Sequence, residues 1–333
     1  MKPPRIAVVI TCWNYEAYVA NAIRSVVSQD CDECELVVID DGSTDTSWDV
    51  IQREGVAAYR IENSGQRAAG LYGLERTRAP FVLFLDADDE LAPGSLATIL
   101  SELDDDVAKL QFSLTRIDHR GDTLGAGTTL EGFRDRHVIA DSVLHTGVYT
   151  TPPTSGNVFR RDVCEYLREM DYDPAIDGLP LFVAPFMGDI VSLPQRLGRY
   201  RIHDKNFSGL GRAVDPAPLR QELRRFVMRM EHLRRILERT GRADALVRPE
   251  EAYYYIERNF YLAIAEGRRP PIKCFLSLLR KLQYQRYPLK TKGTIAAFCL
   301  LTMILPNRNA RRGLAYRLNG GNRSTVGLLQ ALM

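Results

Sequence analysis

The sequence predicts a doubly wound α/β fold, in which a mixed, mostly parallel sheet is flanked by helices. Three short apolar runs occupy residues 6–11, 36–40 and 81–86, and segments with helical spacing separate them. Continuous apolar runs of this length are typical of parallel strands that are buried on both faces. Strands that alternate with helices form such a sheet, and its ligands bind outside the carboxyl ends of the strands.

The helices between these strands follow from apolar spacing and from turn residues. Residues 18–29 place apolar side chains on one helical face, and residues 42–54 begin with capping residues that lead into a helix. Residues 57–61 are expected to form a weaker strand. Residues 66–79 are expected to form a helix, although it contains two glycines.

Beyond residue 92 the pattern becomes mixed. Residues 118–152 are rich in Gly, Thr and Asp and have no steady period, so we expect them to be loops that shape a cleft. The other expected elements are a capped helix at 93–106, a strand at 107–118, a short strand and a helix within 155–170, a buried helix at 178–187 and two strands within 189–203.

From about residue 216 the chain is helical and basic, which predicts two domains, residues 1–212 and 213–333. Residues 1–200 hold 18 Lys and Arg against 32 Asp and Glu, a net charge of −14, whereas residues 201–333 hold 26 against 10, a net charge of +16. This asymmetry indicates that the second part meets an anionic surface, either on the first part or outside the chain.

The composition favours a cytoplasmic protein. The six cysteines are irregularly placed, as expected of reduced thiols, and Cys31 and Cys34 have no second pair nearby, so an ordinary loop is favoured over redox or zinc chemistry. The N-terminal apolar run is too short for a signal peptide. The longest apolar run, at 294–305, has 12 residues, short of the roughly 20 that span a bilayer.

Carboxylates crowd the end of the third apolar run. Asp86 and Asp88 lie two residues apart and can bracket one hard cation, Mn²⁺ or Mg²⁺, which prefers oxygen ligands. Two carboxylates held together are costly without a cation. The alternative is a solvated acidic turn in which Asp88 or Asp89 caps the element that follows, and capping is the default role of Asp89.

The first two strand ends also carry polar residues. Thr11 can offer its hydroxyl to a planar heterocycle, and Asp40 and Asp41 can accept hydrogen bonds from a base or a ribose. The alternative is a pair of turns, with Asn14 as the N-cap of the first helix. Neither segment fits the Gly-x-Gly-x-x-Gly or Walker phosphate loops, so phosphates need another neutralising group.

Four motifs in order resemble the inverting family 2 glycosyltransferases, which have the nucleotide-diphosphosugar (GT-A) fold. The resemblance covers about residues 5–210, with residues 1–212 as the GT-A catalytic domain and 213–333 as a basic helical region. The motifs are "VVITCWNYEAYVANAIRSVVSQ", "ELVVIDDGSTDTSWDVI", "NSGQRAAGLYGLERTRAPFVLFLDADDEL" and "YRIHDKNFS".

The resemblance implies a role for each matching residue on the donor side. Thr11 and Asp41 would hold the nucleotide base, with Asp40 beside them. Asp86 would lie near the ribose and Asp88 would bind the metal ion on the diphosphate. Two further matches are expected: Arg67 in a segment that contacts the nucleotide, and His203, which would reach the metal or the diphosphate, unless it is a buried histidine bonded to backbone.

On the acceptor side, the resemblance places Gly156 and Asn157 near the acceptor sugar. It places the base that deprotonates the acceptor hydroxyl at the start of a helix, where this chain has Asp177. Asp171 and Asp173 are the other candidates, and Asp177 can instead be a helix cap. Leu71 and Gly178 replace residues common in the family.

The expected activity is metal-dependent, inverting transfer from a nucleotide-diphosphate sugar, with a UDP-sugar as the expected donor, to a saccharide or lipid-linked acceptor in cell-surface polysaccharide synthesis. A catalytically silent nucleotide-sugar-binding scaffold is the alternative. A sugar-phosphate nucleotidylyltransferase is disfavoured because no glycine- and arginine-rich loop follows residue 11. The basic C-terminal region is expected to lie on an anionic membrane surface or to pack on the catalytic domain. No nucleic-acid partner is expected, because no nucleic-acid-binding motif accompanies the charge.

Overall fold

The computed structural model describes residues 3–203, 214–285, 287–318 and 325–332. Its internal contacts divide the chain into two compact units. The sheet unit comprises Met1–Asp141 and Tyr149–His203, and the helical unit comprises Ser142–Val148 and Asp204–Met333. The expected domain boundary between residues 212 and 213 lies outside the described residues.

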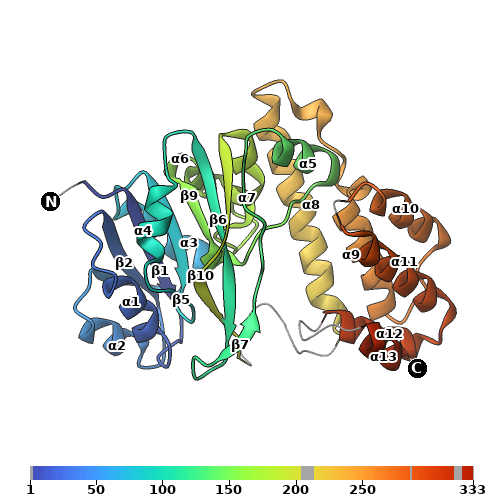
Figure 1. Ribbon diagram of the computed structural model, residues 1–333, viewed down its shortest axis with the longest axis horizontal. Coiled ribbons are helices and arrows are strands. Elements are labelled where there is room, and N and C mark those ends of the chain that lie inside the picture. Colours follow the sequence, from blue (N-terminus) through green and yellow to red (C-terminus); the bar gives the residue numbers. More distant parts are fainter. Residues whose placement is uncertain (1–2, 204–213, 286, 319–324, 333) are drawn as a thin grey trace. The chain divides into compact units, whose positions relative to one another are not determined.

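The described part of the sheet unit contains one ten-stranded mixed sheet (Figure 1). Its strands are β1 (Ile6–Cys12), β2 (Cys34–Asp41), β3 (Ala58–Ile61), β4 (Phe81–Asp86), β5 (Glu90–Leu91), β6 (Val107–Ile117), β7 (Thr123–Ala126), β8 (Phe133–Asp135), β9 (Asn157–Arg160) and β10 (Asp189–Arg201). The order is β3-β2-β1-β4-β9-β6-β10-β5, with β7 paired to β6 and β8 to β10. β1 to β4 are mutually parallel, β10 is parallel to β6, and β9 lies antiparallel between β4 and β6. The predicted fold class is confirmed.

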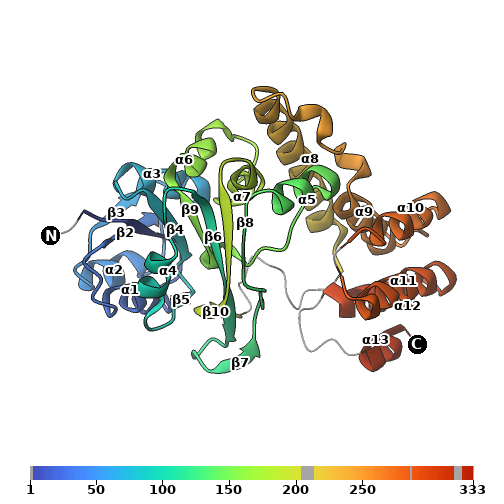
Figure 2. The same ribbon diagram turned by 45° about the horizontal axis from the view of Figure 1, so that its top comes forward.

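Helices cover both faces of the parallel strands (Figure 2). α1 (Val19–Val27), α2 (Ser47–Arg53) and α4 (Ser95–Ser101) pack their apolar residues into one cluster with Val8 and Ile10 of β1. α3 (Gln66–Glu75) lies on the opposite face and comes very close to the sheet. A Cβ on Gly73 would lie 2.4 Å from Val9 Cγ1, so this position of α3 has room only for glycine.

Two expectations about the chain were wrong. Residues 118–152 contain β7, β8 and α5 (Val138–Thr146) rather than loops alone. β7 and β8 are short strands that depend on pairing with β6 and β10, so local sequence gives little sign of them. The segment 189–203 contains the single strand β10 (Asp189–Arg201), which passes through Pro194 with a register shift between Leu193 and Arg196. Proline is tolerated there because a bulge does not need its missing N–H group.

The remaining helical segments are short in the sheet unit and long in the helical unit. In the sheet unit they are α6 (Arg161–Cys164), α7 (Gly178–Val183) and one-turn 3₁₀ segments. In the helical unit they are α8 (Pro216–Glu238), α9 (Tyr253–Ala265), α10 (Ile272–Leu282), α11 (Leu289–Ile304), α12 (Asn307–Leu318) and α13 (Thr325–Leu332). The helical unit has its own core, which includes Phe260, Leu278 and Phe298. None of its described helices combines the length and apolarity required to cross a membrane.

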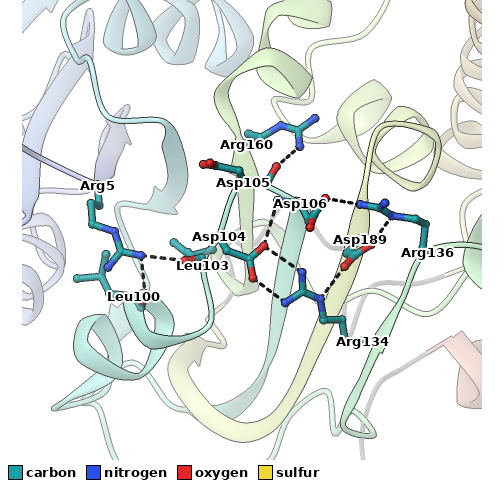
Figure 3. A network of polar contacts seen from close by, with 10 residues as sticks. All are labelled: Arg5, Leu100, Leu103, Asp104, Asp105, Asp106, Arg134, Arg136, Arg160 and Asp189. Atoms are coloured by element: carbon teal, nitrogen blue, oxygen red, sulfur yellow. Dashed lines mark hydrogen bonds and ion pairs between the residues drawn. The ribbon is translucent and has the colours of Figure 1, made fainter.

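An ion-pair network fastens the amino ends of β6 and β10 (Figure 3). Arg134 donates to Asp104 at 2.7 Å and to Asp189 at 2.6 Å. Arg136 donates to Asp106 at 2.8 Å and to Asp189 at 2.6 Å. These contacts hold β8 against β10, at the edge of the sheet opposite the carboxyl ends of the strands. The acidic residues before β6 therefore have structural partners, and pairs as exposed as these contribute about 0–1 kcal/mol each.

The close contact of α3 with β1 gives the first prediction. Gly73→Ala should lower the free energy of unfolding by about 1–3 kcal/mol, because the added methyl overpacks against Val9. Gly293→Ala in α11 is the control, since nothing lies within 4 Å of its Cβ position. There the same change should raise the free energy of unfolding by about 0.5–1 kcal/mol, because alanine favours the helix. Urea denaturation measures both, and equal effects would contradict the tight packing.

Candidate active site

Three aspartates gather where β4 ends. Asp86 closes the strand, and the backbone N–H of Asp89 donates to Asp86 O at 3.0 Å, which folds the chain back at once. Asp86, Asp88 and Asp89 each present a carboxylate oxygen, and these oxygens lie within 4.8 Å of one another. Among the described residues this is the one group of three or more His, Cys, Asp or Glu side chains so arranged. The predicted pair of carboxylates is thus a trio, called the acidic cluster below.

Neighbouring elements orient each carboxylate of the acidic cluster. Gln66 Nε2 donates to Asp86 Oδ1 at 2.7 Å, and His203 Nε2 lies 2.9 Å from Asp88 Oδ2. The backbone N–H of Arg201 donates to Asp89 Oδ1 at 2.9 Å. The default capping role of Asp89 is therefore wrong. The next helix, α4, has Gly94 as its N-cap, and Asp89 instead ties the turn to β10.

The acidic cluster has the electrostatics of a cation site. Burial raises the pKa of Asp86 well above its usual range, and the charges of Asp88 and Asp177 raise it further. Burial and the charges of Asp88 and Asp86 raise the pKa of Asp89 in the same way. Asp89 Oδ2 is buried and accepts no hydrogen bond from the described residues. A hard divalent cation fits this set of oxygen donors, because it would compensate both the charge and the unpaired oxygen.

Arg201 supports the acidic cluster through hydrogen bonds, a role that the sequence did not reveal. Its side chain is only 1% exposed, and it donates to Asp88 O and to Asp118 O, both at 2.8 Å, and pairs with Glu90. The ring of His203 stacks on Tyr18 with centroids 5.1 Å apart. The only sequence signal was the position of Arg201 within the "YRIH" motif.

The ends of β1 and β2 lie beside the acidic cluster. Thr11 is in register with Asp86 on one side and with Ile39 on the other. Asp41 accepts hydrogen bonds from the backbone N–H groups of Ser64 at 2.8 Å and Gly65 at 2.9 Å, so it shapes the loop before α3. Both residues therefore stand at the carboxyl edge of the sheet, where the sequence predicted them.

The side chain of Asp40 holds the turn that follows β2. It is fully buried, pairs with Arg60 Nε at 3.1 Å and accepts from the N–H of Ser43 at 3.2 Å. Asn14 is not the N-cap of α1, which begins at Val19 after Tyr18. Its backbone is left-handed, with φ 59°, and its Oδ1 accepts from Thr44 N at 2.8 Å, which joins the first two strand-end loops.

Asp177 lies near the acidic cluster, because Thr154 bonds to it while the next residue, Ser155, accepts from the backbone N–H of Asp86 at 3.1 Å. It occupies the N-cap position of α7, but its side chain makes no capping bond. Its Oδ2 instead accepts a hydrogen bond from Thr154 Oγ1 at 3.0 Å. Its charge contributes to the raised pKa of Asp86, as expected of a nearby carboxylate. Of the other two candidates, Asp171 is exposed and Asp173 is buried, with its Oδ1 accepting from the N–H of Ala175.

The remaining predicted residues hold loops in place. Arg67 Nη1 donates to Leu167 O at 3.1 Å, and its backbone N–H donates to Pro174 O at 3.2 Å, so it ties α3 to the loop before Asp177. Asn157 is fully buried, and its amide donates to Pro153 O at 2.9 Å. A Cβ on Gly156 would lie 2.7 Å from Pro152. The two residues predicted to lie near the acceptor, Gly156 and Asn157, therefore support the 152–155 loop.

Cys31 and Cys34 are free thiols, as are the other four cysteines. Burial raises the pKa of Cys34 to about 12, which is the opposite of an activated thiolate. No zinc site includes them among the groups that the structure describes. The loop interpretation of this CxxC is therefore favoured by the structure.

Comparison with known proteins decides the family. Residues 7–166, which include β1 to β4, the acidic cluster and β9, match the model of "Glycosyl transferase family 2". This segment of the chain is therefore a glycosyl transferase family 2 segment, which confirms the family resemblance carried by the first three motifs. The fourth motif lies beyond the matched residues.

Relatives and structural neighbours agree with this assignment. An uncharacterized glycosyltransferase of Nostoc sp. is 35% identical over 61% of this chain and 66% of its own length. A GalNAc(5)-diNAcBac-PP-undecaprenol β-1,3-glucosyltransferase of Campylobacter jejuni is 30% identical over 32% of this chain and 36% of its own. The chain thus matches less than two thirds of either relative. Among solved structures, S. aureus TarS 1–349 in complex with UDP-GlcNAc aligns with 95% of this chain and 88% of its own, with a TM-score of 0.53 and 14% identity, which shows a shared fold.

The raised pKa values give the second prediction. Because folding favours protonated Asp86 and Asp89, these groups make the folded protein less stable as pH rises and they ionise. A cation binds only the ionised carboxylates, so Mn²⁺ should raise Tm more at pH 8 than at pH 6. Thermal melts with and without Mn²⁺ measure this. Asp88→Ala should abolish the shift, and Asp171→Ala, an exposed control, should keep it. A shift that is independent of pH would contradict the assignment.

Proposed function

We propose that this family 2 protein is a metal-dependent, inverting glycosyltransferase. It would transfer a sugar from a nucleotide diphosphate, with a UDP-sugar as the expected donor, to a saccharide or lipid-linked acceptor. The observation that carries the proposal is that Asp177 lies near the acidic cluster, to which the Thr154–Ser155 segment connects it. The Asp177 carboxylate makes no capping bond, and the three carboxylates of the acidic cluster form a site suited to a cation. All four lie at the carboxyl edge of one sheet.

The donor would lie along the ends of β1, β2 and β4. Thr11 and Asp41 are placed to meet the base, with Asp40 behind them, and Asp86 to meet the ribose. Asp88 and His203, which face each other at 2.9 Å, would hold Mn²⁺ or Mg²⁺ against the diphosphate. Arg67 would act through the loop that it ties to α3. The cation, when bound, supplies the positive charge that stabilises the departing diphosphate.

Asp177 would act as the general base. Its carboxylate takes the proton of the acceptor hydroxyl, whose oxygen forms a bond to the anomeric carbon on the face opposite the leaving group. The bond between that carbon and the phosphate oxygen breaks, and its electron pair leaves with the nucleoside diphosphate. One bond forms and one breaks, so the configuration at the anomeric carbon inverts. Gly156 and Asn157 would shape the acceptor side through the 152–155 loop.

Two relatives support the choice of substrates. TarS has been seen with UDP-GlcNAc, which fits a UDP-sugar donor. The name of the Campylobacter jejuni relative includes a lipid-linked acceptor, PP-undecaprenol. We therefore place the activity in the synthesis of cell-surface polysaccharide, at the inner face of the cell membrane.

The third prediction tests the chemistry. In a panel of nucleotide sugars with Mn²⁺ or Mg²⁺, the protein should release nucleoside diphosphate from one of them. Asp88→Ala should abolish both metal-dependent nucleotide binding and turnover. Asp177→Asn should keep nucleotide binding but lower transfer by about 10²–10⁴-fold, because it removes the base. Asp171→Asn is the matched control and should turn over like the wild type. Nucleotide binding with no turnover of any donor would instead favour the catalytically silent scaffold.

The helical unit carries a surface suited to an anionic membrane. α10 buries Leu278 and Leu282 but exposes Ile272 (67%) and Leu276 (58%). The start of α11 exposes Leu289 (86%). Exposed cations lie among these side chains: Lys273, Arg280 and Lys290. Apolar side chains surrounded by cations can lie in a lipid interface, where each cation contributes about 1 kcal/mol near anionic lipid.

The fourth prediction concerns this surface. The protein should pellet with anionic vesicles but not with neutral ones, and salt should weaken the binding, because the attraction is screened. Lys273→Glu with Arg280→Glu should abolish it. Arg53→Glu with Arg78→Glu makes the same change of charge at exposed positions of the sheet unit and should leave binding unaltered. Failure of the wild-type protein to bind in a salt-sensitive way would rule out the membrane surface.

A further inference from the structure

A fully buried lysine lies in the middle of the sheet unit. Lys109 of β6 is 0% exposed, and its Nζ donates to Gln111 Oε1 at 2.7 Å, to Tyr149 Oη at 3.1 Å and to Thr151 Oγ1 at 3.0 Å. It forms no ion pair with any carboxylate that the structure describes. Burying an amino group is costly, and the pairing of β6 with its neighbours does not require this side chain. The burial of Lys109 is therefore not explained by the formation of strand β6.

Two of the three hydrogen bonds of Lys109, those to Tyr149 and Thr151, lead to the segment that precedes β9. Lys109 Nζ donates to Thr151 Oγ1, and the Thr151 hydroxyl in turn donates to Asn157 Oδ1, 3.0 Å away. That fixes the amide of Asn157 so that its Nδ2 donates to Pro153 O at 2.9 Å and to Pro152 O at 3.2 Å. Gln111 is in register with Asn157 across the strands, and its Nε2 donates to Thr150 O, next to Thr151, at 3.3 Å.

The loop held in this way ends on Asp177. Thr154 follows the two prolines, and its Oγ1 donates to Asp177 Oδ2 at 3.0 Å. Thr154 is half-buried, so water could satisfy its hydroxyl if only stability were at stake. Asp177 lies at the start of α7 without a capping bond, so this contact fixes the rotation of its carboxylate. With Oδ2 held by Thr154, Oδ1 is left to accept a proton.

We propose that Thr154 is a positioning residue that orients the carboxylate of Asp177, and that buried Lys109 fixes the loop of Thr154 through Thr151 and Asn157. The inference rests on the proposed role of Asp177 as the base. In this proposal Lys109 and Asn157 have a function in catalysis, and neither residue has to touch a substrate. A base must point at the acceptor hydroxyl, and small errors of placement are costly in rate.

The fifth prediction tests Thr154 with two variants of matched size. Thr154→Val keeps the shape but removes the hydroxyl, and should lower kcat by about 10- to 100-fold. KM for the donor, Mn²⁺-dependent nucleotide binding and Tm should stay unchanged. Thr154→Ser restores the hydroxyl and should recover most of the rate. A purely structural residue would move Tm together with kcat, and that result would overturn the inference.

A double mutant separates this inference from the function on which it rests. If Thr154 acts through Asp177, adding Thr154→Val to Asp177→Asn should cause no further loss. Full transfer by Asp177→Asn would overturn the proposed base itself. An inactive Asp177→Asn together with equal rates for Thr154→Val and Thr154→Ser would leave the base in place and overturn the positioning role.

The role of Lys109 is tested by changing each partner of the hydrogen bond between Lys109 and Thr151. Lys109→Met keeps the length of the side chain and removes its donors, and should lower kcat as Thr154→Val does, with donor binding retained. Thr151→Val removes the relay hydroxyl and should have the same effect, whereas Thr151→Ser should keep the rate. Should Lys109→Met fail to fold, the two Thr151 variants decide. Wild-type rates in both Lys109→Met and Thr151→Val would overturn the role of the lysine.

Discussion

The repulsion among three carboxylates at the end of β4 is the constraint around which the sheet unit is organised. Asp86, Asp88 and Asp89 lie within one turn, where burial and mutual charge raise the pKa of Asp86 and of Asp89. The protein provides partial compensation: a hydrogen bond from Gln66, a histidine opposite Asp88 and a backbone N–H from Arg201. What is left uncompensated is a buried oxygen and surplus negative charge, which favours the binding of a cation.

The antiparallel strand β9 makes the second half of the site. Because β9 runs against β4, the loop that enters β9 reaches the carboxyl end of β4, where Ser155 Oγ accepts from the backbone N–H of Asp86 at 3.1 Å. The same loop brings Thr154 to Asp177. If β9 were parallel to β4, the loop that leaves β9, and not the loop that enters it, would lie at this edge. The sheet thus places a group suited to a proton acceptor and a group suited to a cation on one edge.

Much of this could be predicted from the sequence, because β1, β2 and β4 are continuous apolar runs whose ends carry the polar residues. The parts that were missed depend on distant partners. β7 and β8 exist through pairing with β6 and β10, and Arg201 acts on backbone oxygens of Asp88 and Asp118 that no local pattern identifies. Asp89 looked like a cap because its neighbours in sequence are turn residues, whereas its partner is 112 positions away.

That separation along the chain bears on how the protein is made. During synthesis Asp88 and Asp89 leave the ribosome long before their partners, since Arg201 follows Asp89 by 112 residues and His203 follows Asp88 by 115. Contacts between such distant residues form slowly, because a long loop must close first. The strands β1 to β4 can pair early, whereas the carboxyl edge is completed only when β10 joins β6. The nascent chain therefore passes through a stage in which the sheet has begun to form and its most highly charged corner is still open.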